Sequence, residues 1–323
     1  MKKITYFSLA LWFLCLARAS AQDPQFSQFY ANPVYLNPSL VGITGKNRAV
    51  FIHRRQGTTP YGFNTSAFSL DGTLGTQSGW GLQVIHDTQM SGLISSTAYY
   101  SSLGHRLNLS KNAQLGLGIK VGMYQKMLDW DQLVFEDQLD DRNGLINNTN
   151  EQLGRNRIAN ADISAGAIYY SKNLFAGAVI NHVNEPVENF NDENGAKLPA
   201  RFTLHAGGFI YSKSYRRQEY VLSPNLIYER QGEFNYWHLG MYYGSNAWTV
   251  GAWYRWDDSI IFSLGANIAD FRLGYSHDIP VVAHKAPAGN AHELTLAYLF
   301  TLTKNKVKNR YKGKCPSFQK YLF

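Results

Sequence analysis

The residues of this chain that could carry chemistry are histidines next to carboxylates, and their spacing decides what they can do. His277 precedes Asp278 and His292 precedes Glu293, so each pair contains an acid–base or metal-binding combination. Both pairs lie in stretches where apolar and polar residues alternate, which predicts β-strands. Because neighbouring side chains on a strand point to opposite faces, we expect neither pair to act as a unit.

Other chemical motifs are equally incomplete. Gly116-Leu117-Gly118 continues as a strand, and Gly45-Lys46 is followed by Asn47, so neither stretch predicts a phosphate-binding loop. No cysteine or histidine pair has the spacing of zinc ligands. A hydrolase would need a serine beside a histidine base, and no spacing among the nine histidines singles one out. We therefore predict a protein that is not an enzyme, with no catalytic, cofactor-binding or metal-binding residues.

One acidic stretch could still hold calcium. Glu136, Asp137, Asp140 and Asp141 lie close together, but they lack the regular ligand spacing and the glycine of a calcium loop. A solvated external loop is the favoured interpretation, and Trp130 in the same loop is a candidate contact for a protein partner.

The first 21 residues predict a secretory signal peptide. Lys2 and Lys3 precede an apolar run from Ile4 to Ala17, and Ala19-Ser20-Ala21 forms a cleavage site before Gln22. The apolar run is too short for a membrane span. Cleavage between Ala21 and Gln22 would leave Cys315 as the one cysteine, which excludes an internal disulfide.

The net charge of +8 is concentrated at the two ends of the chain. The signal peptide carries three basic residues and residues 304–323 carry seven, with no acidic residue in either. Residues 22–303 keep 21 basic and 23 acidic groups. We therefore expect no binding to nucleic acid, which a uniformly basic domain would favour.

The body of the chain alternates with a period of two, which predicts an all-β transmembrane barrel. Leu115, Leu117 and Ile119 alternate with Gly116, Gly118 and Lys120, and similar stretches follow up to Phe300. One face is apolar and the other is rich in glycine, serine, threonine and arginine, which is typical of lipid on one side and a lumen on the other. The predicted antiparallel strands number about 14: 48–56, 63–72, 79–87, 93–104, 113–125, 160–171, 174–183, 201–213, 218–229, 235–244, 247–256, 259–266, 269–278 and 292–302.

Loop lengths support the same architecture. Every second connection is short, whereas the three longest, 126–159, 184–200 and 279–291, all belong to the other set. A multi-pass outer-membrane barrel with both termini in the periplasm has this pattern. The predicted organisation is a signal peptide (1–21), an N-terminal periplasmic or lumenal segment (22–47), the barrel (48–303) and a basic periplasmic tail (304–323).

The N-terminal segment and the tail hold most of the candidate partner contacts. Asn32-Pro33 and Asn37-Pro38 favour turns, and the aromatic residues around them indicate a segment that packs at the periplasmic mouth or in the lumen of the barrel. The tail could bind a partner, remain solvated, or act through Phe323 as a signal for barrel assembly. The candidate partner-binding residues are Phe26, Phe29, Tyr30, Asn37, Pro38, Trp130, Lys314 and Phe318.

The same segment also carries a resemblance. Together with later motifs it closely resembles the PorP/SprF family of type IX secretion system membrane proteins of Bacteroidota. The resemblance is strongest over 271–278 and at His292-Glu293-Leu294, and it also covers 22–32, 36–42, 68–71, 81–87, 251–259 and 314–318.

The resemblance implies a non-enzymatic role in protein secretion across the outer membrane. It implies as partners a secreted cargo with a type IX C-terminal signal, such as a surface adhesin of gliding motility, and other secretion subunits, besides outer-membrane lipid. A diffusion channel or small-solute transporter is the alternative function, since wide barrels leave an aqueous pore. An occluded lumen would favour docking, and an open one a channel.

Overall fold

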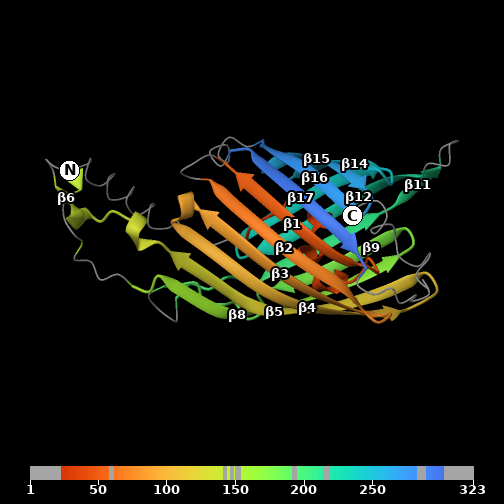
Figure 1. Cartoon of the computed structure of the whole chain (residues 1–323), viewed down its shortest axis with the longest axis horizontal. Coiled ribbons are helices and arrows are strands. Elements are labelled where there is room, and N and C mark those ends of the chain that lie inside the picture. Colours follow the sequence, from red (N-terminus) through yellow and green to blue (C-terminus); the bar gives the residue numbers. More distant parts are fainter. Residues whose placement is uncertain are drawn as a thin grey trace, which may run out of the picture.

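The structure is a computed structural model that describes residues 23–57, 62–140, 144–145, 149, 154–190, 195–213, 219–281 and 289–301. Antiparallel strands form one sheet that closes on itself (Figure 1). The strands are β1 (Asn47–Gln56), β2 (Phe63–Leu74), β3 (Ser78–Gln89), β4 (Ile94–Asn108), β5 (Ala113–Leu128), β8 (Arg157–Ser171), β9 (Leu174–Asn181), β10 (Arg201–Gly208), β11 (Ile210–Lys213), β12 (Glu219–Gln231), β13 (Phe234–Gly244), β14 (Trp248–Arg255), β15 (Ser259–Ile268), β16 (Phe271–Pro280) and β17 (Ala291–Phe300).

The barrel is closed by two sets of pairings. β1 pairs with β17, and β10 pairs with β12. β11 continues the path of β10 after Phe209 and pairs with the same partner, so β10 and β11 together form one wall strand. The result is a closed barrel of 14 antiparallel strands, as the sequence predicts, with 201–213 interrupted once.

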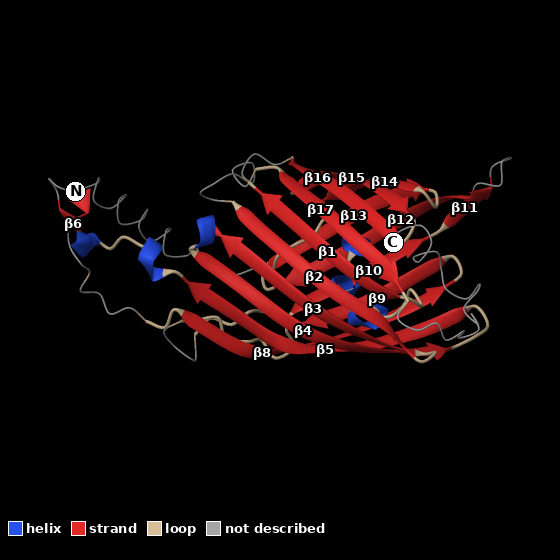
Figure 2. Cartoon of the chain, in the orientation of Figure 1, coloured by secondary structure: helices blue, strands red, loops and turns tan. Residues whose placement is uncertain are grey.

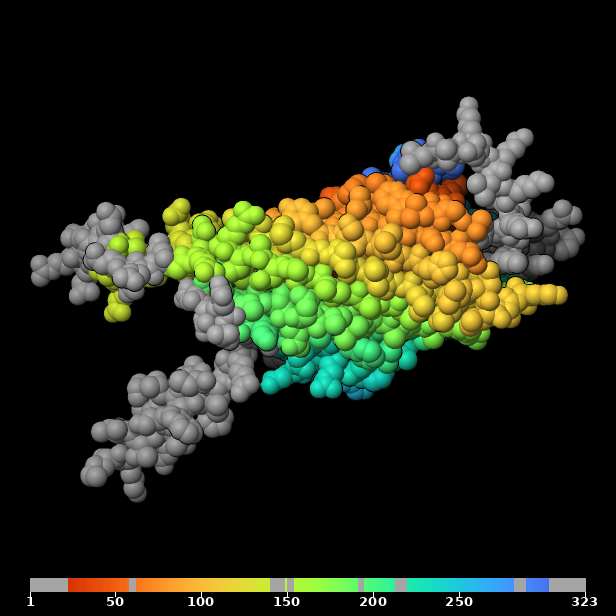
Figure 3. All heavy atoms as spheres, turned by 90° about the horizontal axis from the view of Figure 1, so that it is seen from below, coloured from red at the N-terminus to blue at the C-terminus, as the bar shows by residue number. Residues whose placement is uncertain are grey.

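The connections sort to the two ends as their parity predicts. One end, the short-turn end, carries tight connections such as those between β8 and β9 and between β13 and β14. The other end, the long-connection end, carries the chain between β5 and β8, which includes η4 (Trp130–Gln132), η5 (Glu136–Gln138), β6 (Leu139–Asp140) and β7 (Gly144–Leu145). In Figure 3 this yellow-green stretch extends beyond the body of the barrel.

Side chains alternate between an apolar outer face and a mixed inner face. Leu117, Val121, Val250, Leu273 and Leu296 all point outward and are exposed. Their orientation confirms that they lie on the outer face, and their contact with lipid stays a prediction. The same alternation places His277 and His292 outside and Asp278 and Glu293 inside, so each pair points to opposite faces as predicted.

The lumen is occupied by the chain itself. Short helices lie inside the wall in Figure 2: η1 (Phe29–Ala31), α2 (Pro33–Leu36) and η2 (Pro38–Leu40). We call residues 23–46 the lumenal segment. Its residues from Phe26 to Ile43 are buried without interruption, although they belong to no strand.

Candidate functional site

The lumenal segment crosses the barrel from one end to the other. The backbone N–H of Asp23 donates to Gln231, at the end of β12 on the long-connection side. The backbone N–H of Gly42 donates to Asp71, near the end of β2 on the short-turn side. Asp23 therefore lies at the long-connection end, whereas Asn47 and Phe300, which pair with each other, lie at the short-turn end.

Two asparagine–proline pairs fold the segment into short helices. The side chain of Asn32 accepts a hydrogen bond from the N–H of Tyr35, and that of Asn37 accepts one from the N–H of Ser39. Each proline occupies the first helical position, where its missing N–H costs nothing. The pairs are thus helix N-caps, because asparagine satisfies the free amides that a first helical turn leaves.

A row of wall glycines lets the segment approach the wall closely. Gly79, Gly104, Gly118 and Gly166 face one another across β3, β4, β5 and β8. A Cβ on Gly118 would lie 2.3 Å from the backbone N of Ser39, and one on Gly79 would lie 2.2 Å from a carbonyl oxygen of the segment. At Gly79 and Gly118 a side chain would therefore collide with backbone atoms of the segment, and at Gly104 and Gly166 with the side chains of Val41 and Asn37. We call these four residues the glycine row.

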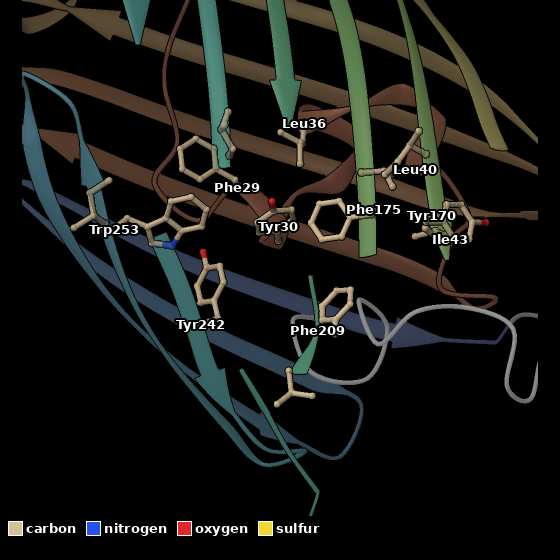
Figure 4. Packing of buried hydrophobic residues seen from close by; sticks show 14 residues of the cluster. Phe29, Tyr30, Leu36, Leu40, Ile43, Tyr170, Phe175, Phe209, Tyr242 and Trp253 are labelled. Atoms are coloured by element: carbon tan, nitrogen blue, oxygen red, sulfur yellow. The ribbon is translucent and has the colours of Figure 1, made fainter. Parts of the chain in front are cut away.

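Aromatic side chains fill the next part of the lumen. Phe29 packs on Trp253 with ring centroids 5.4 Å apart, and Tyr30 lies between Phe175 and Tyr242 at 5.9 and 6.1 Å. Figure 4 shows these rings gathered around Tyr30, from the segment and from strands β9, β13 and β14 of the wall. All five are almost fully buried, so they stabilise the segment in the lumen through apolar contact.

A buried carboxylate holds the segment nearer the long-connection end. The two oxygens of Glu293 accept the backbone N–H groups of Ser27 and Gln28 at 2.7 and 2.9 Å. Arg54 reaches Asp278 at 2.9 Å and Glu293 at 3.7 Å. The hydroxyl of Ser27 also donates to Asp278 at 2.6 Å. Wall and segment therefore share one charged hydrogen-bond network.

A second network fixes the first described residue. Asp23 contacts His182 at 2.7 Å and Arg201 at 3.2 Å, and His182 also contacts Asp162 at 2.8 Å. Burial by itself would lower the pKa of His182, but the carboxylates of Asp23 and Asp162 outweigh burial and raise it to about 9. Burial would raise the pKa of Asp23, but the charges of His182 and Arg201 hold it below its ordinary range.

Above Asp23 the lumen is hollow. A cavity of about 550 Å³ lies at the long-connection end, and Asp23, Pro24 and Gln25 are among its lining residues. We call it the vestibule. Its other lining residues come from the ends of β1–β5 and β13–β17 on this side: Arg54, Gln56, Phe63, Thr65, Asp87, Gln89, Ile94, Ser96, Tyr124, Lys126, Tyr236, Arg255, Asp258, Ser259, Asp278, Pro280, Gly289 and Ala291.

The predicted partner-binding residues fall into three places. Phe26, Phe29, Tyr30, Asn37 and Pro38 are buried against the wall of the barrel, so their contacts are with the chain itself and their role toward a separate protein stays a prediction. Trp130 lies in the long connection after β5, in contact with Phe135 at 6.5 Å between ring centroids. Three further predictions, the cleavage site at Ala21 and Gln22, Lys314 and Phe318, lie outside the described residues.

The acidic loop and the histidines form no metal site in the described part of the chain, where no cluster of three potential ligands exists. Asp137 accepts a hydrogen bond from the hydroxyl of Thr149 at 3.0 Å. The rings of His277 and His292 are in contact on the outer face, tilted by 35° and with centroids 4.5 Å apart. Among the described residues no helix is long and apolar enough to cross a membrane.

Sequence reasoning missed the wall charges that hold the segment. Arg54, Glu293 and Asp278 each lie at an inward position of an alternating strand, and that position is the signal that could have identified them. Their partners are more than 200 residues away in the sequence, so spacing gave no indication that these three would converge.

The chain was compared with protein families, curated proteins and solved structures. A family model described as type IX secretion system membrane protein PorP/SprF matches residues 18–298. No curated protein sequence is significantly similar to the chain. Solved structures with a similar fold include the Pseudomonas putida toluene transporter TodX (TM-score 0.49, 10% identity, covering 83% of this chain and 93% of that chain). The Ralstonia pickettii toluene transporter TbuX has a TM-score of 0.46 at 10% identity, covering 83% and 92%.

A Pseudomonas aeruginosa FadL homologue has a TM-score of 0.41 at 12% identity, covering 84% and 94%. Similarity at this level carries no information about a ligand or a function. The family model, by contrast, spans most of the chain. This outer-membrane β-barrel therefore belongs to the PorP/SprF family of type IX secretion system membrane proteins.

Proposed function

We propose that this barrel is a non-enzymatic docking or anchoring component of type IX secretion, which holds a secreted cargo protein at its long-connection end. The observation that carries the proposal is the filled lumen. The lumenal segment lies against the glycine row, the aromatic rings and two charged networks. A barrel packed in this way presents surfaces and connections to a partner, whereas a diffusion channel needs a continuous aqueous path.

The ends of the barrel differ in what they offer to a partner. The short-turn end offers tight turns. The long-connection end carries the vestibule and the chain with Trp130 and Phe135, an aromatic pair of a kind that is enriched at protein interfaces. We therefore propose that the long-connection end faces outward and contacts the cargo.

Affinity purification from native membranes with mass spectrometry tests the proposal. We expect the full-length barrel to retain a secreted protein carrying a type IX C-terminal signal. A variant with Trp130→Ser and Phe135→Ser should lose it, whereas a matched variant with Lys111→Ser and Asn112→Ser, in the short turn after β4, should keep it.

The alternative function predicts different results. A small-solute channel would co-purify with no secreted protein, and the wild-type barrel would conduct ions steadily in a planar bilayer. Those two results together would replace docking with transport.

A further inference from the structure

One basic side chain in the lumen has no partner of opposite charge. Lys120 points inward from β5 and is only 3% exposed. Its Nζ lies 4.5 Å from the centroid of the Tyr100 ring, and among the described residues the ammonium group forms neither an ion pair nor a hydrogen bond. The ring attracts the positive charge, but a ring face cannot satisfy all three N–H donors.

The wall beside Lys120 does not supply the missing acceptors. Ser102 and Ser164 face Lys120 across the strand register, one on each side. Their hydroxyls form no hydrogen bond with any residue that the structure describes. Burying a charge without a hydrogen-bonding partner is costly, so the folded barrel gains stability from any acceptor that binds beside Lys120.

The carboxylates that attract Lys120 are bound to other cations. Asp162 lies 2.8 Å from His182, and Asp23 lies 2.7 Å from the same histidine and 3.2 Å from Arg201. Both carboxylates attract Lys120 from beyond ion-pairing distance, whereas Arg201 repels it. The raised pKa of His182 keeps this histidine charged at neutral pH. Within this group, two carboxylates therefore serve three cations.

A small cavity lies at the same place. Its volume is about 30 Å³, and Lys120, His182 and Arg201 line it together with Asp23 and Tyr35 of the lumenal segment. Four of its lining residues also line the vestibule, so the two spaces adjoin and a small solute can enter from the long-connection end. Because a water molecule needs at least about 10–15 Å³, the cavity holds two waters or one small ion.

We propose that this cavity binds a small inorganic anion of the size of chloride, held by the ammonium group of Lys120. Chloride accepts hydrogen bonds and donates none, and it balances the extra positive charge, which water does not. Phosphate has four oxygen atoms and does not fit in the space of two water molecules. Since Asp23 and Tyr35 belong to the lumenal segment, the anion stabilises the contact between the segment and the wall.

Crystallography with bromide tests the proposal, because bromide replaces chloride and is located by its anomalous scattering. Crystals of the purified barrel grown in bromide should show an anomalous peak within hydrogen-bonding distance of Nζ of Lys120. Lys120→Met keeps the length of the side chain but removes the charge, so it should abolish the peak. Lys126→Met is the matched control on the same strand, since Lys126 is already paired with Glu188 at 3.4 Å, and it should keep the peak.

The accessibility of the lumenal segment in solution is the second readout. A cysteine at Gln25, with Cys315→Ser, reacts with maleimide when the segment loosens. At equal ionic strength, gluconate in place of chloride should speed this reaction at least about threefold, as expected when chloride exceeds its dissociation constant about twofold. The same exchange should have no effect in Lys120→Met. Heat-modifiable gel mobility confirms that each variant still forms a barrel.

Each result supports or overturns the anion site. A peak that Lys120→Met alone abolishes, together with a slower reaction in chloride, supports it. Absence of the peak would mean that water satisfies Lys120 or that the lysine has lost its proton, and either would overturn the proposal. A peak without an effect of chloride in solution would mean an adventitious ion only, and a peak that persists in Lys120→Met would belong to another group. Both would also overturn the site, and cargo docking is unaffected by any of these results.

Discussion

The two halves of the lumen are built on different principles. Toward the short-turn end, the glycine row lets residues 37–42 lie directly against the wall, where all six are buried and where Asp71 and Arg106 also bind the backbone of Gly42 and Val41. Toward the long-connection end, charged side chains hold the segment by single hydrogen bonds, and a cavity of about 550 Å³ remains. The short-turn half is closely packed, whereas the long-connection half keeps an open cavity.

The difference separates a closely packed part of the lumen from an open part. Contact between backbones leaves no room for a ligand, so it suits a permanent barrier. The charged and polar side chains at the other end surround an open cavity instead. The predictions below separate the two halves experimentally, in order of decreasing expected effect.

The largest effect should come from Gly118→Ala in the glycine row. The added Cβ would lie 2.3 Å from the backbone N of Ser39, so the segment and the wall must move apart, at a cost of about 1–3 kcal/mol. We expect wild type to be silent in single-channel recordings and the variant to conduct.

Gly265→Ala is the matched control, because its Cβ would meet atoms no closer than 3.6 Å. It should remain silent. Equal conductance in both variants, or in neither, would contradict the idea that the glycine row seals the lumen.

A charge on the outer face should weaken the barrel without opening it. Leu273→Arg and Val250→Arg place a cation in lipid at positions that are 44% and 39% exposed, which costs about 2–4 kcal/mol near the midplane. Heat-modifiable gel mobility should show a lower unfolding temperature for both. Unchanged stability would contradict the assignment of this face to lipid.

The substitution Glu293→Gln should loosen the lumenal segment only near the long-connection end, where Glu293 binds it. The amide keeps the shape but removes the charge that receives Ser27, Gln28 and Arg54, at a cost of about 1–3 kcal/mol. A cysteine at Gln25, with Cys315→Ser, should react faster with maleimide in this variant. The variant should still conduct no ions. A Glu293→Gln barrel that conducts would mean that the two halves of the lumenal segment do not move independently.

The smallest effect should be a pH dependence at Asp23 and His182. Because the pKa of His182 is raised, its stabilisation is complete below the ordinary value of 6.5 and is lost as the pH rises through about 9. Because the pKa of Asp23 is lowered, its contribution is present above 3.8 and is lost as the pH falls below that value. The segment should therefore loosen between pH 8 and 10.

The same Gln25→Cys probe measures this loosening, normalised to a cysteine at exposed Ser110. Three other charged residues, Arg201, Lys120 and Asp162, also lie near Asp23 and His182. A His182→Gln variant therefore shows how much of the pH dependence comes from the histidine. The step near pH 9 should disappear in that variant. A step that remains would assign the titration to another group.

The sequence by itself determined the wall. A period of two is a local property, so the alternation around Leu117 and Leu273 was enough to predict the strands and their outer face. Loop lengths gave the parity of the two ends for the same reason. The predicted strand 201–213 is divided into β10 and β11 by Phe209. The side chain of Phe209 belongs to the buried cluster that contains Tyr30 and Phe175.

Only the tertiary structure decided what fills the barrel. Aromatic residues and asparagine–proline pairs predicted a segment that packs at the mouth or in the lumen, but not that it crosses from Asp23 at one end to Gly42 at the other. The glycine row and the convergence of Arg54, Asp278 and Glu293 depend on the register between strands. Register joins residues far apart in the chain, and no local pattern contains that information.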